Sequence, residues 1–225
     1  MVGRRRYHDG CAVAHGLDLI GERWALLVVR ELLLGPKRFT DLRAGMPGAS
    51  PDVLTQRLRE LQQAGVVQRR KLPPPASAWV YELTEWGAEL EPVVTHLGRW
   101  AGRSPSMRHD APIGADSLLL SLKALFDPYT AAGFDAVITL AIGDARYQVH
   151  VTGDHIDIAR DETAVPQTTL QVDTGVLSAL LHDGLPLDEA QRTGQATVSG
   201  DPAVAERFLT LFPLPEPALG PSLAP

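Results

Sequence analysis

The sequence predicts an α+β protein divided into two domains, and three observations lead to this prediction. Apolar residues recur at helical spacing through much of residues 1–103, whereas residues 134–173 form short strand-like runs separated by Gly-Asp turns. Residues 1–103 hold 15 Lys and Arg against 11 Asp and Glu, a net charge of +4, and residues 104–225 hold 6 against 16, a net charge of −10. Because residues 104–114 are polar and contain Pro and Gly, we expect them to link domains 1–103 and 115–213, with a disordered Pro-rich tail at 214–225.

The composition is that of a globular protein, with 44% hydrophobic and 21% charged residues among 225. No run approaches 18 apolar residues, and no apolar segment follows the basic N-terminus. We therefore expect neither a membrane span nor a secretory signal. The single cysteine, Cys11, excludes an intrachain disulfide and fits a reducing compartment, for which the cytoplasm is the default.

The sequence lacks the motifs of the common enzyme classes. G-x-S-x-G, the Walker loop and H-E-x-x-H are all absent, and the carboxylates are spread singly. Asp144, Asp154, Asp183 and Asp201 stand at expected turns and helix caps, which a structural role explains. We therefore expect no enzymatic activity and no cofactor.

Three helices are predicted at the start of the first domain. Residues 14–35 carry apolar side chains at helical spacing until a Gly-Pro pair ends the pattern. Residues 38–46 form a short second helix, for which Thr40 is the expected N-cap. Ser50 then caps a third helix with Pro51 at its first position, where the missing proline N–H is not needed.

Gly65 closes the third helix, and the pattern then changes. Residues 66–72 and 78–84 are expected to form strands of a hairpin with a stiff, proline-containing loop. Residues 84–102 are helical again, with Pro92 tolerated only in a first turn or at a kink. This order of three helices, a hairpin and a helix is that of a winged helix-turn-helix, whose third helix enters the major groove and whose wing touches the DNA backbone or minor groove.

The third helix has the pattern of a DNA-reading helix. At about 100° per residue, Leu54, Leu58 and Leu61 fall on one stripe, and Arg and Gln side chains occupy the other face. Arg and Gln pair bidentately with guanine and adenine. A solvated face would explain such a helix taken alone, but the neighbouring helices and the basic hairpin favour DNA. The residues expected at the DNA are Arg38, Thr40, Ser50, Pro51, Asp52, Thr55, Gln56, Arg57, Arg59, Arg69, Arg70 and Lys71.

Residues from Cys11 to about Trp100 resemble the HxlR-type winged-helix regulators of bacteria. The runs LDLIGERW and LTQRLRELQQAG are specific to that family rather than to winged helices in general. The resemblance implies a homodimer on palindromic double-stranded operator DNA, with the first and last helices of the domain at the dimer interface. The wing loop LPPPASA is longer and richer in proline than the family pattern.

Some members of that family are similar in having a cysteine just before the first core helix that senses electrophiles or oxidants. Cys11 aligns with it; Arg4 to Arg6 would lower its pKa, and Asp9 would raise it. The alternative is a buried cysteine that acts only as a small hydrophobic residue. Without a second cysteine, a switch needs an adduct or a Cys11–Cys11 bond between subunits.

The second domain is predicted to contain a small sheet covered by helices. A helix is expected first, then four strands, a helix, a strand and a last helix capped by Asp201 with Pro202 at its first position. In order, these elements are expected at residues 116–126, 134–143, 145–153, 155–161, 168–173, 174–184, 194–202 and 203–212.

Parts of residues 115–213, above all GQATVSGDPAVAERFLTLF, resemble the SCP2 sterol-carrier fold. That resemblance implies an antiparallel-rich sheet and an apolar tunnel for a hydrophobic small molecule, although a solid core is the alternative. The function predicted from the whole sequence is a dimeric transcriptional regulator that responds to an apolar ligand. The alternatives are a lipid carrier whose winged helix mainly dimerises, and an electrophile sensor that acts through Cys11.

Overall fold

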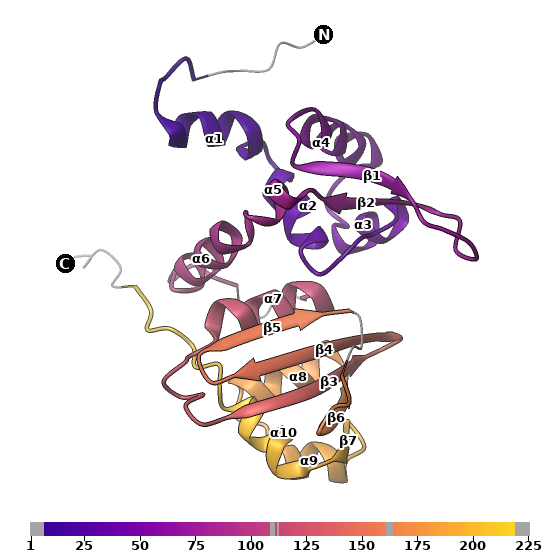
Figure 1. Cartoon of the computed structure of the whole chain (residues 1–225). Coiled ribbons are helices and arrows are strands. Elements are labelled where there is room, and N and C mark those ends of the chain that lie inside the picture. The colour runs from indigo at the N-terminus through magenta and orange to yellow at the C-terminus, as the bar shows by residue number, and fades with distance from the viewer. Residues whose placement is uncertain (1–6, 109–110, 112, 161–163, 219–225) are drawn as a thin grey trace, which may run out of the picture. The chain divides into compact units, whose positions relative to one another are not determined.

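The computed structural model describes residues 7–108, 111, 113–160 and 164–218, and it divides the chain into two compact units, residues 1–94 and 95–225 (Figure 1). The division falls inside a helix rather than in the expected linker, so the domain boundaries predicted from the sequence stay a prediction. Of the predicted tail, residues 219–225 lie outside the described residues. Over the described ranges, no helix is long and apolar enough to cross a membrane.

The first unit has the predicted order of helices followed by a hairpin and a helix, which confirms the winged helix-turn-helix. Strands β1 and β2 pair antiparallel, with Val67 opposite Leu83 and Lys71 opposite Trp79. Its elements are α1 (Ala12–Ile20), α2 (Ala25–Leu32), α3 (Phe39–Gly45), α4 (Pro51–Gln63), β1 (Val67–Lys71), β2 (Trp79–Leu83), α5 (Glu85–Ala88) and α6 (Glu91–Gly102), which runs across the division between the units.

The single helix predicted over residues 14–35 is wrong, because the chain breaks between α1 and α2. The N–H of Gly21 still bonds to the carbonyl of Leu17 at 2.8 Å, but Trp24 then adopts a left-handed φ of 77°. The Trp24 ring lies against Gly48, where an added Cβ would meet the indole at 2.9 Å. The side chain of Trp24 thus packs the break against the turn between α3 and α4.

Two further expectations about helix ends have different outcomes. Thr40 is not the N-cap of α3: Arg38 holds that position, and its N–H donates to the Asp41 carboxylate at 3.2 Å. Residues 84–102 form two helices, α5 and α6, and Pro92 falls in the first turn of α6 as the sequence requires. There its missing N–H removes no helical hydrogen bond.

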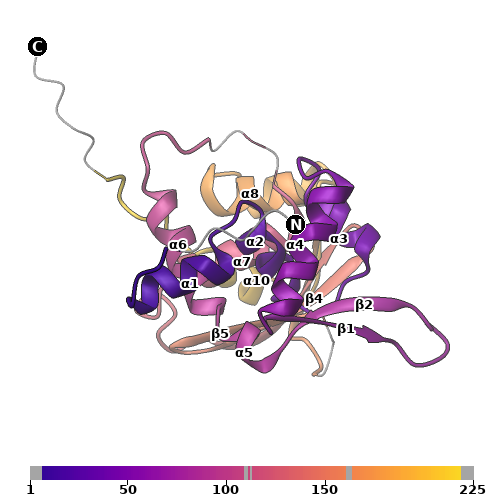
Figure 2. The same ribbon diagram turned by 90° about the horizontal axis from the view of Figure 1, so that it is seen from above.

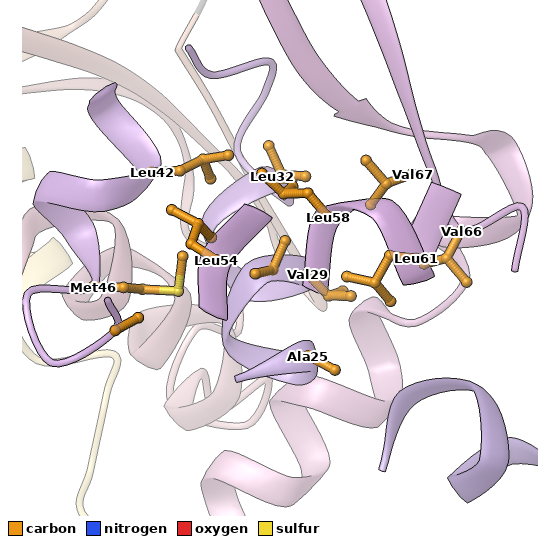
Figure 3. Close-up of a cluster of buried hydrophobic side chains, with 12 residues drawn as sticks. Ala25, Val29, Leu32, Leu42, Met46, Leu54, Leu58, Leu61, Val66 and Val67 are labelled. Atoms are coloured by element: carbon orange, nitrogen blue, oxygen red, sulfur yellow. The ribbon is translucent and has the colours of Figure 1, made fainter. Parts of the chain in front are cut away.

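The core of the first unit lies between α2, α3 and α4 and the start of the wing (Figure 3). The predicted stripe of Leu54, Leu58 and Leu61 is fully buried, facing Val29 and Leu42 among others. Burying one leucine contributes about 1.5–3 kcal/mol, so this stripe fixes which face of α4 remains outside.

The second unit contains a five-stranded sheet in the order β5-β4-β3-β6-β7. The β3–β6 pair is parallel and the other three pairs are antiparallel, which confirms the expected antiparallel-rich sheet. Helix α7 contacts β5, α9 contacts β7, and α10 contacts β6 and β7. The elements are α7 (Ala115–Leu125), β3 (Asp135–Ile142), β4 (Ala145–Thr152), β5 (His155–Ala159), β6 (Thr168–Val172), α8 (Thr174–His182), α9 (Leu187–Arg192), β7 (Ala196–Gly200) and α10 (Pro202–Leu209).

The turns of this sheet confirm the predicted strand ends. Gly143 and Gly153 have φ of 58° and 61°, the left-handed conformation that tight hairpins need. Asp201 caps α10 through the N–H of Ala203 at 2.9 Å, also as predicted. Helix α9 was not predicted from the sequence, although acidic residues in its first turn and Arg192 in its last are signals of a helix.

A buried polar cluster ties α7 to the sheet in this unit. The Asp116 carboxylate accepts a 2.6 Å hydrogen bond from the Tyr147 hydroxyl and bonds of 2.6 and 2.7 Å from Arg160. Burial, and then the Asp116 carboxylate, raise the pKa of Tyr147 well above its ordinary value. The cluster therefore holds Tyr147 as a neutral hydrogen-bond donor, and the sequence pattern gave no sign of it.

Candidate nucleic-acid interface

Helix α4 presents the polar face that the sequence predicts. The Ser50 hydroxyl accepts the Val53 N–H at 3.3 Å, Pro51 holds the first helical position, and Gly65 ends the helix with a φ of 75°. Because the leucine stripe faces the core, four predicted DNA residues face outward and are exposed. These residues are Asp52, Thr55, Gln56 and Arg59.

The outward side chains differ in how free they are to bind. The Thr55 hydroxyl donates to the carbonyl of Pro51 at 2.8 Å, and the Gln56 amide donates to the Glu60 carboxylate at 3.0 Å. Both bonds are exposed and exchange with water at little net cost. Arg59 has no hydrogen bond or ion pair to any described residue, so its guanidinium is available in full.

Arg57 lies apart from this outward set. Only 12% of its side chain is exposed; it pairs with Glu60 and lies 3.8 Å from the carboxylate of Glu22. The pairs tie α4 to itself and to the chain between α1 and α2. This placement favours a structural role over the DNA contact predicted for Arg57.

Two predicted residues lie at the start of α3. Arg38 is exposed at the N-cap, and Thr40 is exposed within the first turn, where its hydroxyl lies 3.3 Å from the Asp41 carboxylate. Both are therefore on the surface, where the first helix of such a motif crosses the DNA backbone.

The wing extends beyond the helices of the first unit, as Figure 2 shows for β1 and β2. All three predicted wing cations, Arg69, Arg70 and Lys71, are exposed on β1. The guanidinium of Arg70 binds Glu82 on β2 through bonds of 2.8 to 3.0 Å. Those hydrogen bonds, above all, hold the pKa of Glu82 below its ordinary value.

A buried ion pair that sequence reasoning missed connects the wing to the helices. Glu31 on α2 is 2% exposed, and its carboxylate lies 2.5 Å from the Lys37 ammonium and 2.8 Å from Arg30. Lys37 also exchanges two backbone hydrogen bonds with Tyr81 on β2, at 2.9 and 2.8 Å. The signal in the sequence was Glu31 itself, a carboxylate inside the apolar stripe of α2.

Gly45, at the end of α3, completes this connection. A Cβ added there would meet the Glu31 carboxylate oxygen at 2.2 Å, so the carboxylate occupies the space that a side chain would need. Helices α2 and α3 and strand β2 are therefore all fixed around one buried charge.

Helix α4 packs on the core through its leucines and is followed by a basic hairpin. This arrangement defines a DNA-binding protein of the winged helix-turn-helix type. The family model for the HxlR-like helix-turn-helix matches residues 19–108, which include α4 and the whole wing. The chain belongs to the HxlR-like helix-turn-helix family of transcriptional regulators.

Individual relatives match the same part of the chain. It is 39% identical over 95 residues to the uncharacterized HTH-type transcriptional regulator YdeP of Bacillus subtilis (strain 168), covering 41% of this chain and 72% of that protein. It is 39% identical over 84 residues to the HTH-type transcriptional regulator YodB of the same organism, covering 37% of this chain and 75% of that protein. The solved reduced form of YodB is 33% identical, with a TM-score of 0.39, and covers 44% of this chain and 97% of that one.

Proposed function

We propose that this protein is a sequence-specific DNA-binding regulator that acts as a homodimer on a palindromic operator. The observation that carries the proposal is the exposed polar face of α4, with Gln56 and Arg59, next to the cationic wing. Arg and Gln on a major-groove helix read base edges, and wing cations neutralise phosphates. Although the net charge of the protein is −6, these Arg, Gln and Lys side chains are concentrated on α4 and the wing, the two elements that would contact DNA.

Exposed apolar residues on α1 and α6 support the homodimer. Val13 and Leu17 lie one turn apart on α1, and both are exposed. Val93, Leu97 and Trp100 follow one stripe of α6, where Trp100 is 73% exposed. Apolar stripes of this kind are typical of surfaces that bind a partner, and we propose that a second copy of the chain covers them.

The test is the affinity of the full chain for DNA from upstream of its own gene, compared with a scrambled fragment of equal length. We expect the upstream fragment to bind more tightly, with two chains per site in sedimentation. Because each neutralised phosphate releases counterions, log K should fall with log[salt] with a slope of about 0.9 per phosphate. Equal affinity for both fragments, or an affinity independent of salt, would contradict the proposal and favour the lipid-carrier alternative.

We further propose that the second unit controls DNA binding by taking up an apolar small molecule, in keeping with its resemblance to sterol carriers. Residues 104–225 carry a net charge of −10, so they repel phosphate and do not aid DNA binding. Helices α9 and α10 pack on strands of the sheet, which agrees with the helix-covered sheet that the resemblance implies. A ligand that prefers one dimer geometry would shift the population of DNA-competent dimers.

Fatty acids, sterols and hydrophobic drugs that raise the melting temperature of the full chain should also change its operator affinity. Coupling of about 1–3 kcal/mol is the usual scale, which corresponds to roughly 5–150-fold in affinity. Operator DNA must change the ligand affinity by the same factor. A hit that binds tightly and leaves operator affinity unchanged would make the second unit a carrier rather than a controller.

Cys11 supports a thiol-based response as a second function. It is exposed at the N-cap of α1, which supports a reactive thiol over a buried one. The backbone N–H groups of Ala14 and then Val13 lower the pKa of the thiol. A lowered pKa increases the thiolate fraction near neutral pH, and the thiolate is the species that reacts with electrophiles.

We expect Cys11→Ser to fold and to bind DNA like the parent, because serine is a favoured N-cap. Diamide or a quinone should alter DNA binding of the parent and not of the variant, measured by anisotropy before and after reduction. An identical response in both proteins would remove Cys11 as a sensor.

A further inference from the structure

The wing hairpin has two chemically different faces. Directly opposed residues of an antiparallel pair share a face, and the register places Arg69 opposite Tyr81 and Lys71 opposite Trp79. The other face holds Gln68, Arg70 and Glu82. Alternate residues of one basic run, which looks uniform in the sequence, therefore point to opposite sides.

The Arg70 face has its charge cancelled within the protein. Glu82 accepts hydrogen bonds from Arg70 at 2.8, 2.9 and 3.0 Å and from the Gln68 amide at 2.9 Å. These contacts raise the pKa of Arg70 and lower that of Glu82, so both stay ionised and bound to each other. An anion at this face would have to displace a bidentate carboxylate.

The Arg69 face carries cations and aromatic rings without a carboxylate. The guanidinium carbon of Arg69 lies 4.7 Å from the centroid of the Trp79 ring and 5.8 Å from that of Tyr81. Neither Arg69 nor Lys71 forms an ion pair with a described residue. Trp79 is 51% exposed, and a ring in that position holds a long flexible side chain in one place.

We propose that Arg69, Lys71 and Trp79 form the phosphate-binding face of the wing, with Trp79 as the positioning residue for Arg69 and with Arg70 as a structural residue. A guanidinium held by its face against a ring keeps its in-plane N–H donors, and this planar fork matches two phosphate oxygens. The partner is the DNA backbone, so this inference rests on the proposed function. It gives different roles to Arg69 and Arg70, both of which the sequence predicts at the DNA.

The anchoring of the wing base supports this assignment. Tyr81, under Arg69, is the residue whose backbone pairs with Lys37 beside the buried Glu31. Arg69, whose guanidinium lies 5.8 Å from the Tyr81 ring, is thus next to the residue that ties the hairpin to Lys37, whereas residues 72–78 connect the outer ends of the two strands. A fixed cation loses less conformational entropy when it binds than a mobile one.

The experiment measures affinity and salt slope of the full chain on a fragment that the parent binds and on its scrambled counterpart. Arg69→Ala should weaken both equally and reduce the log–log slope by about 0.9, the value for one phosphate contact, whereas Arg70→Ala should leave the slope unchanged. Trp79→Leu should weaken binding, Trp79→Phe should retain it, and Trp86→Leu should have no effect. Trp86 is the matched control because it is also 51% exposed, on α5.

A double-variant cycle separates positioning from direct contact. If Trp79 acts through Arg69, then Trp79→Leu should add no further loss to Arg69→Ala, whereas independent contacts would give additive losses. The assignment is overturned if the losses add, if Arg70→Ala lowers the slope as Arg69→Ala does, or if Trp79→Leu behaves like Trp86→Leu. A parent without measurable DNA binding overturns the proposed function as well, so the two failures are distinguishable.

Discussion

Replacing Glu31 by glutamine should lower the free energy of unfolding of the first unit by about 3–5 kcal/mol, the usual loss when one member of a buried ion pair is removed. Lys37 is 8% exposed and keeps its ammonium group inside the protein, while the neutral amide no longer balances it. Arg30 loses the same carboxylate. Urea unfolding followed by tryptophan fluorescence measures the effect, since Trp24, Trp79 and Trp86 lie in the first unit.

The matched control is Glu22→Gln, which removes a 54% exposed carboxylate lying 3.8 Å from Arg57. A long pair with one exposed partner contributes about 0–1 kcal/mol, and Arg57 keeps its pair with Glu60, so the control should unfold almost like the parent. Replacing both partners, as Glu31→Leu with Lys37→Met, should recover part of the loss, because the buried ammonium is then removed together with its carboxylate and only Arg30, whose side chain is 25% exposed, still loses its ion pair. If Glu31→Gln is no less stable than Glu22→Gln, the buried pair does not hold the unit together.

Gln56→Ala and Arg59→Ala should each reduce discrimination between operator and random DNA by about 1–3 kcal/mol, the range for a bidentate contact to a base. Arg59 should have the larger effect, because a hydrogen bond from a charged guanidinium is stronger than one from a neutral amide. The measurement is the ratio of the two affinities at one salt concentration, because each affinity alone depends on salt.

The controls for this prediction lie on the same helix. Gln62→Ala changes an exposed glutamine one turn beyond Arg59, at the C-terminal end of α4. It should leave the ratio unchanged, because the N-terminal part of a recognition helix contacts the bases. Arg57→Ala should lower stability through its lost pairs with Glu60 and Glu22 and should likewise spare discrimination. If Arg57→Ala alters the ratio as Arg59→Ala does, α4 meets DNA by a different face.

The parts of the first unit that could be predicted are those in which the residues that form a local apolar pattern are also the residues buried in the core. The stripe of Leu54, Leu58 and Leu61 repeats at helical spacing, and the side chains that repeat are the ones buried. The break between α1 and α2 could not be predicted in this way, because apolar residues recur at helical spacing on both sides of Gly21. The left-handed turn at Trp24 accompanies the packing of its ring on Gly48, a contact between residues far apart in the sequence.

The sequence predicted which residues lie at the candidate site, but it did not predict which of them would bind DNA and which would be structural. Exposure on α4 follows from the helical period, which places Arg59 outside without further knowledge. The structural role of Arg57 depends on its pairs with Glu22 and Glu60. The structural role of Arg70 depends on the register that brings Glu82 opposite Gln68. Glu22 and Glu82 lie far from their arginine partners in the sequence, so the basic runs alone did not separate binding cations from structural ones.

The two backbone hydrogen bonds between Lys37 and Tyr81 divide the wing into an attached base and an outer part that extends beyond it. Strand β2 begins at Trp79, and the pairing with Lys37 is at Tyr81, two residues later. The proline-containing loop at residues 72–78 therefore belongs to the outer part of the wing. At about 3.3 Å per strand residue, adding or removing one pair of residues in that outer part would change its reach by one step without moving the base. Insertions and deletions in this loop can therefore accumulate during evolution and adapt the wing to differently shaped DNA, while the helices that read bases keep their geometry.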